Sequence, residues 1–241
     1  MNRYEELVIR RLPPEQAELY RQERAREKAA LQTIEQGIRT ADSELFGRGL
    51  TAINRTPSSW RRAFLLIARQ ADVPDQIRRY FLERFWLHHG DYLRQEVGDD
   101  RLLMRGLRIL LPPYTGPAML LYRGESWKNR CRRTYGPPWS TSQAVAEDYA
   151  ATGDVSLSHG GSVLLRTLAP PAAIICAPIL ECEDRYGEQE YLVDRSRLSG
   201  VEVLWRYPQL TIGERQALHR ASPKAALRRS IRDRQPPHGR N

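Results

Sequence analysis

Two glutamates, Glu188 and Glu190, are separated by a single residue and stand just before an apolar run that ends at Val193. Successive side chains of a strand alternate between its faces, so a strand over residues 188–193 would direct both carboxylates to one side. Paired carboxylates can stabilise positive charge that develops on a sugar carbon and can take a proton from an attacking group. The structural alternative for the pair is exposed charge at a sheet edge.

Arg123 ends a second apolar run and is followed by Gly124. An arginine at the end of a strand can deliver its guanidinium to an anion, because the planar fork of N–H donors matches two phosphate oxygens at once. The alternative is a surface arginine beside a turn.

Three hydroxyl side chains, Ser140, Thr141 and Ser142, directly precede a segment at residues 143–151 that we expect to be helical. Ser142 is suited to cap that helix, because its hydroxyl can accept hydrogen bonds from the first unpaired backbone N–H groups. Ser140 and Thr141 then remain for another purpose, although all three could belong to a plain capping segment.

Taken in order, these segments resemble the R-S-E class of ADP-ribosyltransferases, which includes arginine-specific bacterial toxins, phage enzymes and vertebrate ecto-enzymes. That class has an arginine on its first core strand, a Ser-Thr-Ser strand followed by a helix, and then a Gln/Glu-x-Glu segment. The matching residues are Tyr122-Arg123-Gly124, then Trp139-Ser140-Thr141-Ser142 with Ala146, Tyr149 and Ala150 in the next helix, then Glu188-Gln189-Glu190. The resemblance covers about residues 119–205.

The resemblance implies a NAD site made by Arg123, Gly124, Ser140, Thr141 and Ser142 together with the catalytic glutamate. Arg123 would contact the NAD phosphates and the nicotinamide-side ribose, and Gly124 would bind the nicotinamide carboxamide through its backbone. Ser140 and Thr141 would hold the nicotinamide ribose and position the catalytic glutamate.

Glu190 is the catalytic glutamate that the resemblance implies, acting with Arg123 and Ser140. It would hydrogen-bond the ribose 2′-hydroxyl and stabilise the oxocarbenium-like transition state, where a carboxylate gains strength as positive charge develops. Glu188 would engage the acceptor and help to deprotonate it. In the family, a glutamate at this position accompanies arginine acceptors, whereas a glutamine accompanies asparagine, cysteine or nucleobase acceptors.

Three positions depart from the family pattern. Tyr186 lies two residues before the first glutamate and is followed by Gly187, whereas binary-toxin relatives usually carry an aromatic residue about three before it. Residues 152–161 stand where the family places a phosphate–nicotinamide loop, but they include no arginine. Trp139 replaces the commoner phenylalanine before the serine.

The elements that must position these residues change character near residue 113. Apolar periodicity and capping residues predict helices over residues 13–46, 56–74, 75–89 and 99–110, the first closed by Gly47 and Gly49. Short apolar or β-branched runs bounded by Gly and Pro predict strands over residues 119–123, 162–167, 172–176, 188–193 and 201–205.

Helices followed by strands predict an α+β fold. We expect a helical N-terminal region over residues 1–112, for partner or substrate recognition or as a lobe of the catalytic domain. A NAD-binding, strand-rich catalytic core over residues 113–212 and a basic tail over residues 213–241 would follow. The resemblance further implies a split, mainly antiparallel β-sandwich with a NAD cleft between its sheets.

Charge and apolar content limit the partners. The 241 residues carry 38 Lys and Arg against 29 Asp and Glu, for a net charge of +9, and eight of those basic residues lie between Glu214 and Asn241. Such a tail can bind nucleic acid or an acidic membrane, although solvated terminal charge is the favoured interpretation. We expect no metal site and no membrane span. We also expect no signal peptide, and therefore synthesis in a cytoplasm. Injection into a host cell and packaging in a virion remain open as destinations.

Cys176 lies in an apolar run, where we expect it to be a core residue. A disulfide with Cys182 is the alternative, although free thiols are the default in a reducing compartment.

We therefore expect a mono-ADP-ribosyltransferase that moves ADP-ribose from NAD+ to an arginine of a target protein and releases nicotinamide. The alternatives are an ADP-ribosyltransferase that acts on nucleic acid or a small molecule, and a non-catalytic interaction protein with a degenerate NAD site.

Overall fold

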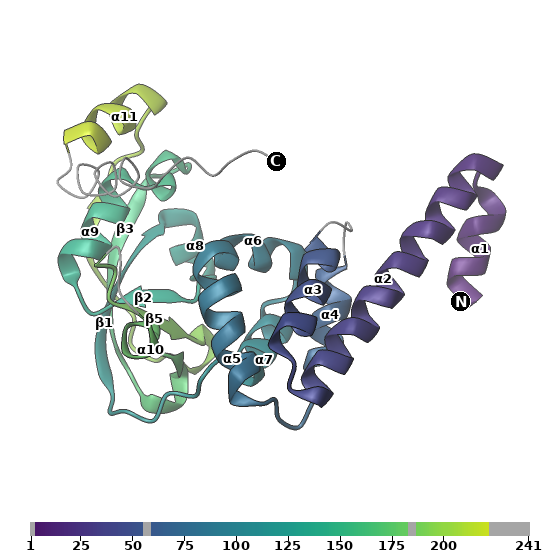
Figure 1. Ribbon diagram of the computed structural model, residues 1–241. Coiled ribbons are helices and arrows are strands. Elements are labelled where there is room, and N and C mark those ends of the chain that lie inside the picture. Colours follow the sequence, from purple (N-terminus) through teal and green to yellow (C-terminus); the bar gives the residue numbers. More distant parts are fainter. Residues whose placement is uncertain (1–2, 55–58, 183–186, 222–241) are drawn as a thin grey trace. The chain divides into compact units, whose positions relative to one another are not determined.

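A computed structural model describes residues 3–54, 59–182 and 187–221 of the chain (Figure 1). The chain divides into two compact units, Met1–Pro112 and Pro113–Asn241. The described part of the first unit is helical, and all the strands of the described residues lie in the second. The expectation of an α+β protein is therefore confirmed.

The first unit is built from helices around an aromatic core. Its elements are α1 (Arg3–Arg11), α2 (Pro14–Thr40), α3 (Ser43–Asn54), α4 (Trp60–Ile67), α5 (Asp75–Tyr80), the π-helical η1 (Phe81–Trp86), α6 (Leu87–Val97) and α7 (Asp100–Leu110). Phe46, Trp60, Phe64 and Phe81 are fully buried, so the apolar faces of α3, α4 and η1 meet in this core. Asp99 caps α7 as expected, accepting hydrogen bonds from the backbone N–H groups of Arg101 and Leu102.

The long helix that we expected over residues 13–46 is wrong, because the chain forms two helices there. α2 ends at Ala41, which takes a left-handed φ of 55°, and the Asp42 carboxylate accepts from Leu45 N (2.8 Å) at the start of α3. Gly47 and Gly49, expected to end a helix, lie inside α3. A Cβ on Gly47 would come within 2.0 Å of the Tyr80 hydroxyl, so this glycine permits close helix packing.

The remaining helix expectations differ at their ends. The helix expected over residues 75–89 continues through η1 and α6 to Val97, where Gly98 takes a positive φ of 63°. The helix expected over residues 56–74 ends earlier than expected, because α4 stops at Ile67, and its expected start lies in residues 55–58, outside the described residues. Helix α1 was not expected from the sequence. Among the described residues, no helix is both long enough and apolar enough to cross a bilayer.

The second unit contains one antiparallel sheet with the strand order β4-β5-β2-β1-β3-β6. Its strands are β1 (Met119–Ser126), β2 (Pro138–Ser140), β3 (Ser162–Ala169), β4 (Ile174–Cys176), β5 (Glu190–Val193) and β6 (Glu202–Tyr207). Its helices are α8 (Trp127–Arg132), α9 (Gln143–Thr152), α10 (Pro178–Glu181) and α11 (Ile212–Ala221), with short 3-10 turns η2 (Asp154–Leu157), η3 (Pro171–Ala173) and η4 (Arg195–Arg197).

The sheet is continuous where we expected two packed sheets, but its two halves are weakly joined. β1 pairs with β3 along its whole length, from Met119 opposite Ala169 to Ser126 opposite Ser162. In contrast, β1 pairs with β2 at one position, Tyr122 opposite Ser140. The half made of β4, β5 and β2 therefore meets the half made of β1, β3 and β6 at a single residue pair.

The two faces of this sheet are covered differently. One face carries the apolar core of the unit, which includes Leu121, Trp139 and Tyr191. On the other face α9 packs against β1, and the Ser162 hydroxyl donates to the carbonyl of Ala150 in α9 (2.6 Å). Cys176 is buried in β4 as expected, and it is a free thiol, as are Cys131 and Cys182.

Candidate functional site

Ser140 and Glu190 lie directly opposite one another on the neighbouring strands β2 and β5. Tyr122 of β1 lies opposite Ser140 on its other side. Residues that face each other across an antiparallel pair project from the same face of a sheet. The fold therefore gathers Tyr122, Ser140 and Glu190 on one face, although Ser140 and Glu190 are far apart in sequence.

Glu188 is not part of the strand that we used to place it. β5 begins at Glu190, and the two residues on either side of Glu188, Gly187 and Gln189, take left-handed φ values of 61° and 46°. Strand alternation therefore does not apply between the two glutamates. The prediction that a strand over residues 188–193 directs both carboxylates to one face is wrong. A non-glycine residue such as Gln189 adopts this conformation at a cost, which surrounding contacts must offset.

The hydroxyl segment provides those contacts. The Ser140 hydroxyl donates to the main-chain carbonyl of Glu188 (2.7 Å) and accepts from the backbone N–H of Ser142 (3.0 Å). Thr141 donates through its backbone N–H to the carbonyl of Gln189 (3.3 Å) and through its hydroxyl to the Gln189 side-chain oxygen (2.8 Å). Residues 140 and 141 therefore determine the conformation of residues 188 and 189.

Ser142 caps α9 as expected from the sequence, because its hydroxyl accepts from the backbone N–H of Val145 (3.3 Å). The cap begins α9 directly beyond β2. Of the three hydroxyls, one therefore starts the helix and two hold the glutamate segment.

Gly124 lies where β1 packs closely against α9. A Cβ there would come within 2.5 Å of the backbone nitrogen of Ala150 and within 2.6 Å of the carbonyl oxygen of Ala146. Both atoms belong to the helix backbone, which cannot move aside as a flexible side chain can. This packing requires glycine whether or not its backbone also binds a ligand.

Arg123 follows the last residue pair that joins β1 to β2. Its Nε donates to the carboxylate of Glu125 (2.9 Å), and its Nη1 donates to the carbonyl of Pro138 in β2. Strand alternation places Arg123 on the other face of β1 from Tyr122. Its guanidinium nevertheless extends toward β2 and contacts the carbonyl of Pro138, two residues before Ser140. The Arg123 side chain is 13% exposed.

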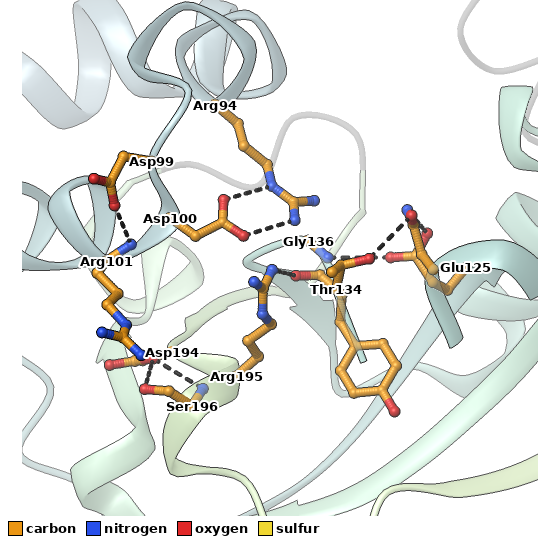
Figure 2. A network of polar contacts seen from close by, with 12 residues as sticks. Arg94, Asp99, Asp100, Arg101, Glu125, Thr134, Gly136, Asp194, Arg195 and Ser196 are labelled. Atoms are coloured by element: carbon orange, nitrogen blue, oxygen red, sulfur yellow. Dashed lines mark hydrogen bonds and ion pairs between the residues drawn. The ribbon is translucent and has the colours of Figure 1, made fainter. Parts of the chain in front are cut away.

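Glu125 is a residue that sequence reasoning missed. Its side chain is 1% exposed and accepts from four donors: Arg123, the Asn129 side chain (3.0 Å), and the backbone N–H groups of Ser126 (2.9 Å) and Gly136 (3.1 Å). Figure 2 shows Gly136 beside the Glu125 carboxylate, with the contact dashed. The available signal was its spacing, since a carboxylate two residues after a strand arginine shares its face.

The pKa of Glu125 is lowered from its ordinary value. Burial alone would raise that pKa, but the positive charge of Arg123 and the hydrogen bonds from Asn129, Gly136 and Ser126 outweigh it. Arg123, Glu125, Asn129 and Gly136 are called the Glu125 network below.

The Cys176 thiol, on which the charge of Glu190 acts, is unsuited to nucleophilic chemistry. Burial, with smaller contributions from Glu181, Cys182 and Glu190, raises the pKa of the Cys176 thiol. A thiol with a raised pKa stays protonated at neutral pH and is inert. Glu188, Gln189 and Glu190 are each half-buried.

Residues 152–161 contain no arginine, but two arginines from later in the chain lie against them. Arg215 of α11 donates to the carbonyl of Thr152 (3.1 Å) and pairs with Asp154 (2.8 Å), and Arg206 of β6 donates to the carbonyl of Gly160 (3.4 Å). Tyr186, the aromatic residue before the glutamate segment, lies outside the described residues. Within the described ranges, no group of three or more His, Cys, Asp or Glu side chains could hold a metal ion.

No protein-family model, no curated protein and no solved structure matches this chain.

Proposed function

We propose that the chain is a mono-ADP-ribosyltransferase that transfers ADP-ribose from NAD+ to an arginine of a target protein and releases nicotinamide. The observation that carries the proposal is the pairing of Ser140 with Glu190 across β2 and β5. In addition, the Ser140 hydroxyl donates a hydrogen bond to the main-chain carbonyl of Glu188. Three short sequence segments, each weak alone, thus lie on or directly adjacent to the neighbouring strands β1, β2 and β5.

The proposed fold is the split sheet of ADP-ribosyltransferases. It is supported by the sheet's two three-stranded halves, which strand pairing joins at Tyr122 and Ser140. We place the NAD site at this junction, where the backbones of β1 and β2 separate. Arg123, Ser140 and Glu190 stand on the three neighbouring strands β1, β2 and β5 at that point.

The proposed chemistry needs no general acid, because nicotinamide leaves from a cationic pyridinium as a neutral molecule. Departure leaves positive charge on the ribosyl centre, and the Glu190 carboxylate stabilises that charge and accepts a hydrogen bond from the ribose 2′-hydroxyl. Arg123 binds the phosphates, and Ser140, Thr141 and Ser142 line the ribose side.

Glu188 supports a protein arginine as the acceptor. A guanidinium has a pKa above about 12 and attacks slowly while it is protonated. A carboxylate beside it can orient it and take its proton as the new C–N bond forms. The left-handed residues around Glu188 lift it out of the strand, so that it is presented from a turn and not from the sheet.

The proposal is tested with purified protein and NAD carrying a label on its adenylate half, with and without a cell lysate. We expect nicotinamide release and transfer of label to protein, both lost in Glu190→Gln. Glu202→Gln is the matched control, because Glu202 is an exposed carboxylate of the same sheet paired with Arg166 (2.6 Å). Label that is removed by nuclease and not by protease would exclude protein arginine, and mass spectrometry identifies the acceptor residue.

A further inference from the structure

The Glu125 network joins two segments that the sheet itself leaves apart. β1 pairs with β2 at Tyr122 and no further along β1, so the backbone of residues 136–138 separates from residues 123–125. Glu125 accepts from Gly136 N (3.1 Å) and from Arg123 Nε (2.9 Å), and Arg123 donates to Pro138 O. The network therefore spans the junction between the two halves of the sheet.

The network also fixes the orientation of the Arg123 guanidinium. Contacts to Nε and to Nη1 define the plane of this group and so fix the position of Nη2. Gly136 lies against that third nitrogen, since a Cβ on Gly136 would be 2.4 Å from Arg123 Nη2 and 2.9 Å from Cζ. An arginine side chain that is not held in this way loses rotamer entropy when it binds a ligand.

Burying a carboxylate is costly unless it is paired and hydrogen-bonded, and an apolar pair of the same shape often stabilises a fold as well or better. The four donors around Glu125 offset its burial, but stability alone does not account for choosing a charged pair at this junction. A ligand-binding arginine gives a reason, because pre-organised donors bind an anion without paying the cost of ordering.

We propose that Glu125 and Gly136 are positioning residues that hold Arg123 in the orientation that binds the NAD phosphates. This inference rests on the proposed function. Glu125 acts through its carboxylate and Gly136 through the space that its missing side chain leaves.

Two variants disturb the network in different ways. Glu125→Gln keeps the shape of the side chain and removes its charge. Gly136→Ala keeps the carboxylate and pushes on the guanidinium. In the proposed complex, the phosphates that Arg123 binds are remote from the bond that breaks. Weakening the contact between Arg123 and the phosphates therefore removes binding shared by the ground and transition states, and it raises KM with little change in kcat.

The experiment is steady-state nicotinamide release by the full chain as a function of NAD concentration. We expect both variants to raise KM for NAD by about tenfold or more, with kcat within about threefold of wild type. The rise in melting temperature that NAD produces in the wild type should be lost in both at the same NAD concentration. Glu202→Gln should match the wild type.

Each other outcome has a definite meaning. A lower kcat at unchanged KM is the signature of a reduced fraction of folded enzyme, and it would assign the network to stability and overturn the inference. Unchanged kinetics in both variants, or failure of both to fold, would also overturn it while leaving the proposed function intact. Wild-type protein that neither binds NAD nor releases nicotinamide would overturn the proposed function, and the inference with it.

Discussion

The Ser140 hydroxyl donates a hydrogen bond to the main-chain carbonyl of Glu188 (2.7 Å), across 48 positions of sequence. The same oxygen accepts from Ser142 N, so one serine connects the glutamate segment to the start of α9. A side chain in this position holds the conformation of the proposed catalytic segment without itself needing to react.

Ser140→Ala should therefore impair activity more than stability. The partly buried carbonyl of Glu188 loses the Ser140 donor, which costs at most about 1–3 kcal/mol when no other partner replaces it. We expect nicotinamide release to fall by about tenfold or more, measured together with the melting temperature. Ser196→Ala is the control, because it deletes another serine hydroxyl of this unit that donates to Asp194 (2.6 Å). Equal losses of activity in the two variants would contradict a specific role for Ser140.

Glu190 and Glu188 should act in different steps, Glu190 in the release of nicotinamide and Glu188 in the transfer to arginine. Glu190→Gln should reduce nicotinamide release by about 100-fold to 1,000-fold, because it removes electrostatic stabilisation of the transition state. Glu188→Gln should release nicotinamide to water at a rate within about threefold of wild type while transfer to arginine falls by about 100-fold. Product analysis by chromatography, with an arginine analogue as acceptor, measures both rates. Loss of both reactions to the same extent in Glu188→Gln would show that the glutamates act in one step.

Glu125 should make the free energy of unfolding sensitive to acid. Its pKa in the folded protein is lowered from the ordinary value of 4.5, despite burial, by Arg123 and the hydrogen bonds around it. A carboxylate with a lowered folded-state pKa contributes stability that is fully present above 4.5 and is lost as the pH falls through the folded-state value. Glu125→Gln should therefore lower the free energy of unfolding at pH 7 by about 3 kcal/mol. It should also remove part of the decrease in that free energy that the wild type shows below pH 4.5.

Urea unfolding at pH 7 and at several values below 4.5 measures this difference. The control is Glu202→Gln, whose exposed ion pair with Arg166 should contribute little at any pH. If the difference in stability between wild type and Glu125→Gln were the same at every pH, Glu125 would not titrate with a lowered pKa.

Gly124→Ala should destabilise the second unit. The added Cβ would lie 2.5 Å from Ala150 N and 3.0 Å from Ala150 Cα, so α9 must move away from β1. Overpacking of this kind costs about 1–3 kcal/mol. Gly213→Ala in α11 is the matched control, because a Cβ there meets nothing within 4 Å. Thermal unfolding measures both, and equal melting temperatures would show that α9 adjusts without cost.

The sequence by itself determined the features whose causes are local. Ser142 and Asp99 stand just before helices and cap them, because the donors that they satisfy are only two or three residues away. Short apolar runs located β1, β3, β4, β5 and β6, whereas β2 was expected only through the family resemblance. The change from helices to strands near residue 113 predicted the α+β class. The pairing of the serine segment with the glutamate segment was expected through a family resemblance and not through any local rule.

The tertiary structure decided the features whose partners are distant in sequence. Gly47 and Gly49 looked like helix ends, but they lie within a helix because Tyr80 and Ile34 pack against them. Glu188 left the strand because residues 140 and 141 hold its neighbourhood in a turn. The backbone N–H of Gly136 reaches Glu125 only after the chain has passed through α8, so the sequence did not show that Glu125 connects β1 to the segment before β2. Hydrogen bonds and close packing act through space, so local pattern can locate an element but cannot show which backbone atoms will meet it.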